Sequence, residues 1–109
     1  MGWPLRRIPG PPQPVSAPAG LTAETSAFTG QLKLRWSRVP NSRYYEIQTI
    51  PTEDLINDGS WDTVPVKSWP RVQYTVEGYD SGLLLSIRVR AFGAKGPGSW
   101  AKSINARVS

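Results

Sequence analysis

Four stretches of the chain alternate strictly between apolar and polar residues. In the first, Leu32, Leu34 and Trp36 are apolar, whereas the residues between them are charged. The same alternation runs through residues 45–49, 74–77 and 85–91. Successive side chains of a β-strand point to opposite faces of its sheet, so each stretch predicts a strand with one buried and one exposed face.

Turn-forming residues separate these stretches. Clusters rich in Gly, Pro, Asn and Ser occur at residues 40–42, 57–60, 81–82 and 93–98. Further strands fit between the turns at residues 19–25, 61–67 and 99–108. Seven short strands divided by turns predict an all-β, seven-stranded antiparallel sandwich. We expect its core to contain the apolar side chains of the alternating stretches: Trp36, Tyr45, Ile47, Val76, Leu85, Ile87 and Val89.

The first residues differ from the rest. Six of the 11 prolines lie within residues 1–20. Proline lacks a backbone N–H and fixes φ, so this stretch predicts an extended Pro-rich N-terminal arm over residues 1–13, followed by the sandwich over 14–109. A solvated linker is normally poor in large apolar residues. The arm nevertheless contains candidate contacts with a protein partner: Trp3, Leu5, Arg6, Arg7 and Ile8.

Several segments, in their order and spacing, resemble a fibronectin type III domain. They are residues 14–21, L-K-L-R-W at 32–36, Y-E-I-Q at 45–48, T-V-E-G at 75–78, I-R-V-R-A at 87–91, and the 93–98 loop with Trp100 after it. The resemblance covers residues 14–109 and implies an immunoglobulin-like sandwich with Trp36 at its centre. Leu85 occupies the place of that family's corner tyrosine. Another residue must therefore anchor the turn before residue 85, and Tyr79 is the candidate.

Composition narrows the functional classes. A chain of 109 residues fits one domain, and its 39% hydrophobic content, with five Trp, can fill a core. Cys and His are both absent, which excludes disulfides, Cys/His zinc sites, thiol nucleophiles and His-based triads. Residues 54–59 resemble a calcium loop only weakly, because Pro65 stands where the bidentate Glu is required. The glycines of the 93–98 loop precede no helix, so they form no phosphate cradle.

These observations predict a protein that is not an enzyme, with no catalytic residues, no metal and no cofactor. No apolar run approaches the about 18 residues of a membrane span, and the first 12 residues contain no secretory signal, so we expect no membrane association.

The net charge of +5 is scattered along the chain, and no basic run exceeds two residues. Nucleic-acid binding is therefore disfavoured. Arg88 and Arg90 fall on a strand that we expect to lie beside Glu46 and Gln48, with which they can pair across the strands. By the same reasoning, Lys33 and Arg35 are expected to lie against Glu77 on the other sheet.

Three tryptophans exceed what the core needs beside Trp36, and three interpretations of them stay open. Trp61, Trp69 and Trp100 cap the sandwich and stack on arginines, anchor an interface, or, as the weakest alternative, form a platform on which a carbohydrate stacks. Lys95, in the 93–98 loop, is a further candidate contact.

Three functional hypotheses follow. The first is a structural interaction protein, a single module docked through its arm on a larger assembly. Domains of this type occur on bacteriophage particles, so the resemblance implies a virion decoration or minor structural protein, with a capsid or tail protein as partner; a homo-oligomer stays open. The alternative is a binding or spacer module of a secreted bacterial enzyme or adhesin, extracellular or at the cell surface. The third is a basic nucleic-acid-associated protein.

Overall fold

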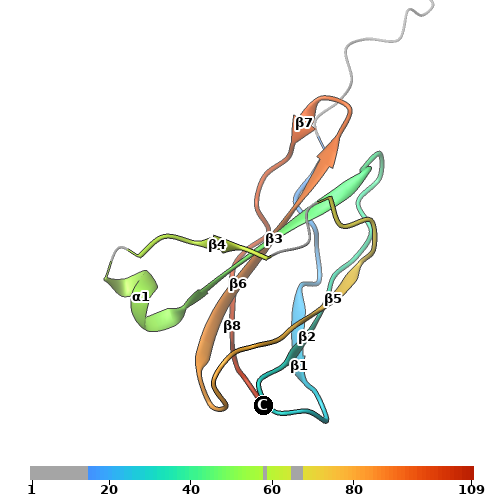
Figure 1. Cartoon of the computed structure of the whole chain (residues 1–109). Coiled ribbons are helices and arrows are strands. Elements are labelled where there is room, and N and C mark those ends of the chain that lie inside the picture. Colours follow the sequence, from blue (N-terminus) through green and yellow to red (C-terminus); the bar gives the residue numbers. More distant parts are fainter. Residues whose placement is uncertain (1–14, 58, 65–67) are drawn as a thin grey trace, which may run out of the picture.

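The computed structural model describes residues 15–57, 59–64 and 68–109, which form two antiparallel β-sheets packed face to face (Figure 1). The first sheet has the order β1-β2-β5, with β1 at Thr22–Thr25, β2 at Leu32–Arg35 and β5 at Gln73–Val76. The second sheet has the order β4-β3-β6-β7, and β8 pairs with β6. Its strands are β3 (Tyr44–Pro51), β4 (Asp62–Thr63), β6 (Leu84–Gly93), β7 (Gly96–Pro97) and β8 (Ile104–Arg107).

The all-β sandwich agrees with the sequence prediction, but its details differ in two places. Eight strands are present in the described part of the chain rather than seven, because the 93–98 loop closes as a short hairpin in which Gly93 pairs with Gly96. A short helix, α1 (Thr52–Ile56), follows β3. Its first turn contains Glu53 and Asp54, which favour a helix N-terminus electrostatically. The stretch with a weak likeness to a calcium loop is the end of this helix and the turn after it, where the Gly59 N–H donates to the Asp54 carbonyl at 2.6 Å.

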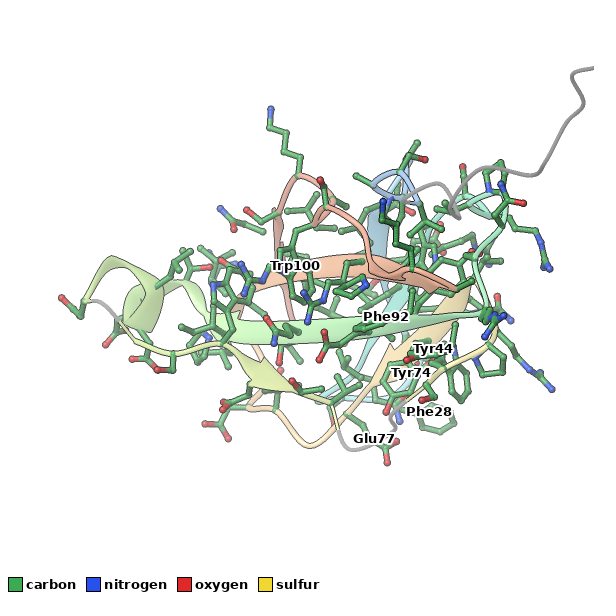
Figure 2. The ribbon with its side chains drawn as sticks, turned by 90° about the horizontal axis from the view of Figure 1, so that it is seen from above. Phe28, Tyr44, Tyr74, Glu77, Phe92 and Trp100 are labelled. Atoms are coloured by element: carbon green, nitrogen blue, oxygen red, sulfur yellow. The ribbon has the colours of Figure 1, made fainter. Side chains whose placement is uncertain are left out.

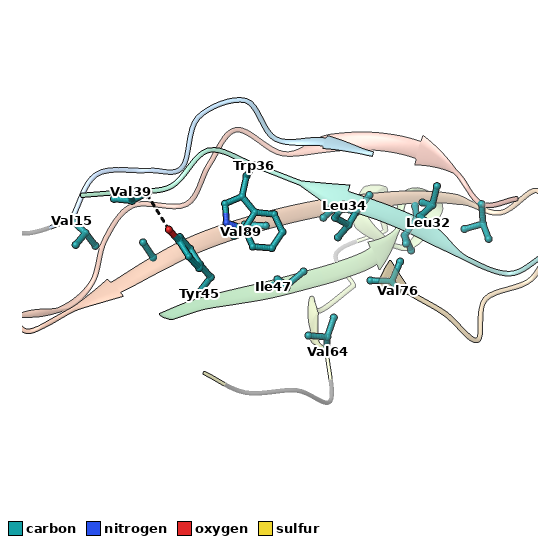
Figure 3. Close-up of a cluster of buried hydrophobic side chains, with 14 residues drawn as sticks. Val15, Leu32, Leu34, Trp36, Val39, Tyr45, Ile47, Val64, Val76 and Val89 are labelled. Atoms are coloured by element: carbon teal, nitrogen blue, oxygen red, sulfur yellow. Dashed lines mark hydrogen bonds between the residues drawn. The ribbon is translucent and has the colours of Figure 1, made fainter. Parts of the chain in front are cut away.

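The core lies between the two sheets, and all seven side chains expected there from the sequence are buried (Figure 3). Trp36 is 3% exposed and packs edge-on against Tyr45, with ring centroids 5.5 Å apart. The Tyr45 hydroxyl accepts a hydrogen bond from the Val39 N–H at 3.0 Å. Alternation explains this arrangement, since exposed residues of β2 and half-buried residues of β3 stand between the buried ones.

Tyr79 anchors the turn that lacks the corner tyrosine. Leu85, in that tyrosine's place, is fully buried. The Tyr79 hydroxyl lies 2.6 Å from Thr49 Oγ1, and the Tyr79 N–H donates to the Gly30 carbonyl at 3.3 Å. Gly30 has a φ of +78°, and a Cβ there would lie 2.7 Å from the Tyr79 carbonyl oxygen. Tyr79 thus links the connection between β5 and β6 both to β3 and to the turn between β1 and β2.

The first described residues lie at the β7 end of the sandwich, and the C-terminus lies at the opposite end (Figure 1). Val15 is buried in the core and packs against the backbone at Gly93 and Gly98. At the other end, the Gly30 N–H donates to the Ser109 carbonyl at 2.8 Å. The arm, with its candidate contacts Trp3, Leu5, Arg6, Arg7 and Ile8, lies outside the described residues. None of the helices in the described segments has the length and apolar character that crossing a membrane requires.

Candidate functional site

The candidate site lies on the outer face of the second sheet. The register between β3 and β6 places Tyr44 opposite Phe92, Glu46 opposite Arg90, and Gln48 opposite Arg88. Residues two apart on a strand share a face, so all six side chains lie on the outside of this sheet. Thr63 of β4 extends the row beyond Gln48, as its Cα partner.

Arginine and aromatic side chains alternate along this face. The Arg88 guanidinium carbon lies 4.4 Å from the ring centroid of Trp61 and 4.1 Å from that of Trp100. The Arg90 guanidinium carbon lies 4.4 Å from the Trp100 centroid and 5.0 Å from that of Phe92. Each arginine therefore lies against two aromatic rings, and Trp100 contacts both arginines.

The series ends on an aromatic pair. The rings of Phe92 and Tyr44 are stacked, with centroids 4.8 Å apart and planes inclined by 14°. Figure 2 shows these two rings together on one side of the strand pair, with Trp100 farther along. We call this set the arginine–aromatic stack. Its members, all half-buried, are Trp61, Arg88, Trp100, Arg90, Phe92 and Tyr44.

Polar side chains of β3 hold both guanidinium groups through hydrogen bonds. Arg90 forms an ion pair with Glu46, with Nη2 and Nε each 2.6 Å from Oε1. Arg88 instead donates from Nε at 3.0 Å and from Nη2 at 2.6 Å to Oε1 of the neutral Gln48. Gln48 Nε2 donates onward to Thr63 Oγ1 at 3.2 Å. The expected pairing of Arg88 and Arg90 with β3 is thus present.

Electrostatics distinguish the two arginines. Burial, followed by the neighbouring charge of Arg90, lowers the pKa of Arg88, while Glu46 opposes that shift. Among the described residues, Arg90–Glu46 is the only ion pair, so the direct contacts of the Arg88 guanidinium are two ring faces and the amide oxygen of Gln48. An exposed ion pair contributes about 0–1 kcal/mol, and a half-exposed cation–π contact about 0.5–1 kcal/mol. Four such ring contacts therefore outweigh the single ion pair in holding this face together.

The other two candidate surface residues lie outside the stack. Trp69 donates from Nε1 to the Gln73 carbonyl at 2.7 Å and packs edge-on against Tyr74, with centroids 5.0 Å apart. Its backbone also forms an isolated bridge with Tyr45 of β3. Lys95 is exposed in the turn between β6 and β7. The structure therefore brings Trp61 and Trp100 together over Arg88 and leaves Trp69 and Lys95 elsewhere.

The expected pairing of Lys33 and Arg35 with Glu77 is wrong. The register places Lys33 opposite Thr75 and Arg35 opposite Gln73. Glu77 lies one residue beyond β5, where its carboxylate accepts a hydrogen bond from Gln31 Nε2 at 3.3 Å.

Sequence comparison with known proteins gives no match: neither a family model nor a curated protein matches the chain. Solved structures do match. The crystal structure of FN3tt superposes with a TM-score of 0.71 at 21% identity, covering 85% of this chain and 92% of that chain. An Fn3-like protein from Clostridium thermocellum gives 0.72 at 17% identity, with the same two coverages of 85% and 92%. The FN5 domain of Drosophila Lar gives 0.64 at 20% identity, covering 85% of this chain and 95% of that chain.

This chain has a fibronectin type III fold. The match covers 85% of this chain. In these terms, the arginine–aromatic stack covers the outside of the larger sheet of a fibronectin type III sandwich. Sequence reasoning missed Tyr44 and Phe92 as members of the stack. Tyr44 lies two residues before Glu46, and Phe92 lies two residues after Arg90. Both could have been found by extending the outward-facing positions of each alternating stretch.

Replacing Trp100 with alanine should destabilise this fibronectin type III sandwich by about 1–3 kcal/mol, because two cation–π contacts and a half-buried ring are lost together. Trp61→Ala is the matched control, since Trp61 contacts Arg88 alone. Urea unfolding of the two variants measures the difference. Equal costs for the two would contradict a continuous stack centred on Trp100.

Proposed function

We propose that this chain is a non-catalytic binding or structural module that attaches to a larger protein assembly through its N-terminal arm. The observation that carries the proposal is that the core of the described sandwich reaches from Val15 to Val108. The exposed-face tryptophans Trp61 and Trp100 are engaged by the domain's own arginines. The apolar residues Trp3, Leu5 and Ile8 precede this core in the sequence.

A virus particle is the assembly that we favour, with a capsid or tail protein as the partner. The support is a fold-level analogy, because isolated modules of this fold decorate such particles. An apolar arm that precedes a sandwich suits a decorating role, because the arm can bind the particle while the sandwich stays on its surface.

A second candidate function is a binding or spacer module in a longer extracellular or cell-surface protein. The observation that favours it is that the first described residues and the C-terminus lie at opposite ends of the sandwich (Figure 1), which lets such modules follow one another in a row. A multi-domain structure, chicken CNTN1 FN1-FN3, also matches this chain, at 18% identity over 31% of that chain.

Nucleic-acid binding is the weakest of the three hypotheses. Arg88 and Arg90 lie close together, but their guanidinium groups are occupied by ring faces, Gln48 and Glu46. Phosphate binding would require these donors to be available.

Removal of residues 1–13 should leave the cooperative unfolding of the sandwich intact and abolish its attachment. Burial of a large apolar side chain contributes about 1.5–3 kcal/mol, so loss of three should weaken binding by more than about a hundredfold. The measurement is co-sedimentation with purified virus particles for the full chain, the truncation and Trp3→Ala. Trp61→Ala serves as the surface control.

Equal sedimentation of all four proteins with the particles would contradict attachment through the arm. Loss of folding in the truncation would show instead that the arm belongs to the domain. Failure of the full chain to sediment with the particles would favour the spacer function.

A further inference from the structure

Strand β5 is the outer strand of its sheet, and no other strand of the described residues pairs with its outer backbone edge. The Val72 carbonyl points toward β2, where it accepts from the Trp36 N–H at 3.0 Å. The next carbonyl, that of Gln73, points away and accepts from Trp69 Nε1. Because backbone groups alternate between the two edges of a strand, the N–H and C=O of Thr75 also face outward. No residue within the described segments bonds to either group.

Two hollows of different character flank this edge. One, of about 320 Å³, is lined by Lys33, Trp69, Arg71, Gln73, Tyr74 and Thr75. The other, of about 350 Å³, is lined by Val64, Tyr74, Thr75, Val76, Glu77 and Tyr79. They share Tyr74 and Thr75, so both open at the same short length of backbone. The first contains both basic side chains, those of Lys33 and Arg71, although most of its exposed surface is apolar. The second contains the two aliphatic side chains, those of Val64 and Val76, and its exposed surface is about equally polar and apolar.

The basic hollow has an unbalanced positive charge. Lys33 and Arg71 are exposed, and neither has a carboxylate within ion-pair distance among the described residues. Arg35 lies next to this hollow, opposite Gln73 in the register. The acidic residue beside these hollows, Glu77, borders the hollow of Val64 and Val76, and its carboxylate accepts a hydrogen bond from Gln31.

The Tyr74 hydroxyl stays a neutral donor near this edge. Burial, followed by the charge of Glu77 and by Tyr79, raises the pKa of Tyr74. Its ring packs edge-on against that of Trp69, with centroids 5.0 Å apart, and lines both hollows.

We propose that the open edge of β5 binds an extended segment of a partner protein in which acidic and apolar side chains alternate. The partner's backbone pairs with the N–H and C=O of Thr75 and extends the sheet by one strand. Its side chains then point alternately to the two faces. The acidic ones meet Lys33 and Arg71, and the apolar ones fill the hollow beside Val76. This binding site goes beyond the proposed function, because it involves neither the arm nor the arginine–aromatic stack.

The test uses a synthetic probe, the capped peptide Thr-Val-Glu-Val-Glu-Val-Thr, and the full ¹⁵N-labelled chain. NMR titration should shift the amide signals of β5, with Thr75 the most affected, and should slow hydrogen exchange at the Thr75 N–H. A peptide with Lys in place of Glu is the matched control. It should bind at least about tenfold more weakly, because it repels Lys33 and Arg71.

Two variants separate the backbone contribution from the charge contribution. Thr75→Pro removes the outward N–H, a change that an outer strand tolerates, and should abolish binding while leaving the fold intact. The double variant Lys33→Glu/Arg71→Glu should reverse the preference between the two peptides. Its control is Arg38→Glu/Lys102→Glu, which makes the same change in net charge at two exposed positions away from the hollows.

Equal binding of the acidic and basic peptides would overturn the proposal, as would signal shifts confined to β1, β4 or β8. Unchanged binding by both test variants would do the same. If Thr75→Pro fails to fold, the charge-reversed variant decides alone. Loss of the arm does not affect any of these outcomes, so they are independent of the attachment experiment.

Discussion

Replacing Trp36 with alanine is expected to lower the free energy of unfolding by about 3–5 kcal/mol, a large part of the stability of a domain this size. Trp36 is 3% exposed and fills the space between the sheets beside Tyr45. Its removal leaves a cavity that neighbours on two rigid sheets close only partly. Urea unfolding of the variant and of the unmodified chain gives the difference directly.

The matched control is Trp36→Phe, which keeps an aromatic ring in the same place. Trp36 Nε1 is the one buried side-chain polar atom without a hydrogen-bond partner in the described part of the chain. Phenylalanine removes that unpaired donor while it loses part of the ring volume, so the cost should be about 1–2 kcal/mol. An unchanged unfolding midpoint for Trp36→Ala would show that the centre of the core lies elsewhere.

The strands that could be predicted from the sequence are those that bury mainly one face, with Ile50 of β3 and Ser86 of β6 as buried exceptions on the other face. Leu32 and Leu34 of β2, and Ile87 and Val89 of β6, alternate with exposed or half-exposed residues because each strand lies between core and solvent. The pairing of Arg88 and Arg90 with β3 followed from the same alternation. By contrast, the five residues of α1 are too few to show a helical period, and the two residues of β7 are too few to alternate.

The arrangement of the surface residues could not be predicted from the sequence and is seen only in the folded structure. Trp61 and Trp100 lie just outside regular strands, so nothing in their spacing shows that both meet Arg88. The failure of the expected contact with Glu77 has a similar cause, because the register between β2 and β5 depends on packing in three dimensions. The open edge of β5 is also invisible in sequence, since strand order and not strand composition decides which strand is outermost.

Gly98→Ala is expected to release the first described residues from the core, at a cost of about 2–4 kcal/mol. A Cβ on Gly98 would overlap the Val15 carbonyl oxygen and would lie 2.8 Å from Val15 Cγ2. Backbone is the obstacle here, so no side-chain rotation relieves the clash. The Gly98 N–H also donates to the Ala91 carbonyl at 2.8 Å, which holds this glycine against β6. The segment around Val15 must therefore move instead.

The damage should be local, and that makes the prediction specific. Val15 lies at the end of the sandwich, so its departure exposes one buried side chain while the centre of the core keeps its contacts. Hydrogen exchange should speed up at the Ser37 N–H, which donates to the Ala19 carbonyl at 2.8 Å, and stay slow at Ile47 and Val89. Gly82→Ala is the control: Gly82 has a φ of +84° and nothing within 4 Å of a Cβ, so it measures left-handed strain alone, about 1–2 kcal/mol. If Gly98→Ala costs no more than Gly82→Ala and the Ser37 N–H keeps its protection, the contact between Val15 and the β6–β7 hairpin does not hold the start of the domain. In that event the arm would leave the sandwich from a different position, and its attachment geometry would have to be derived anew.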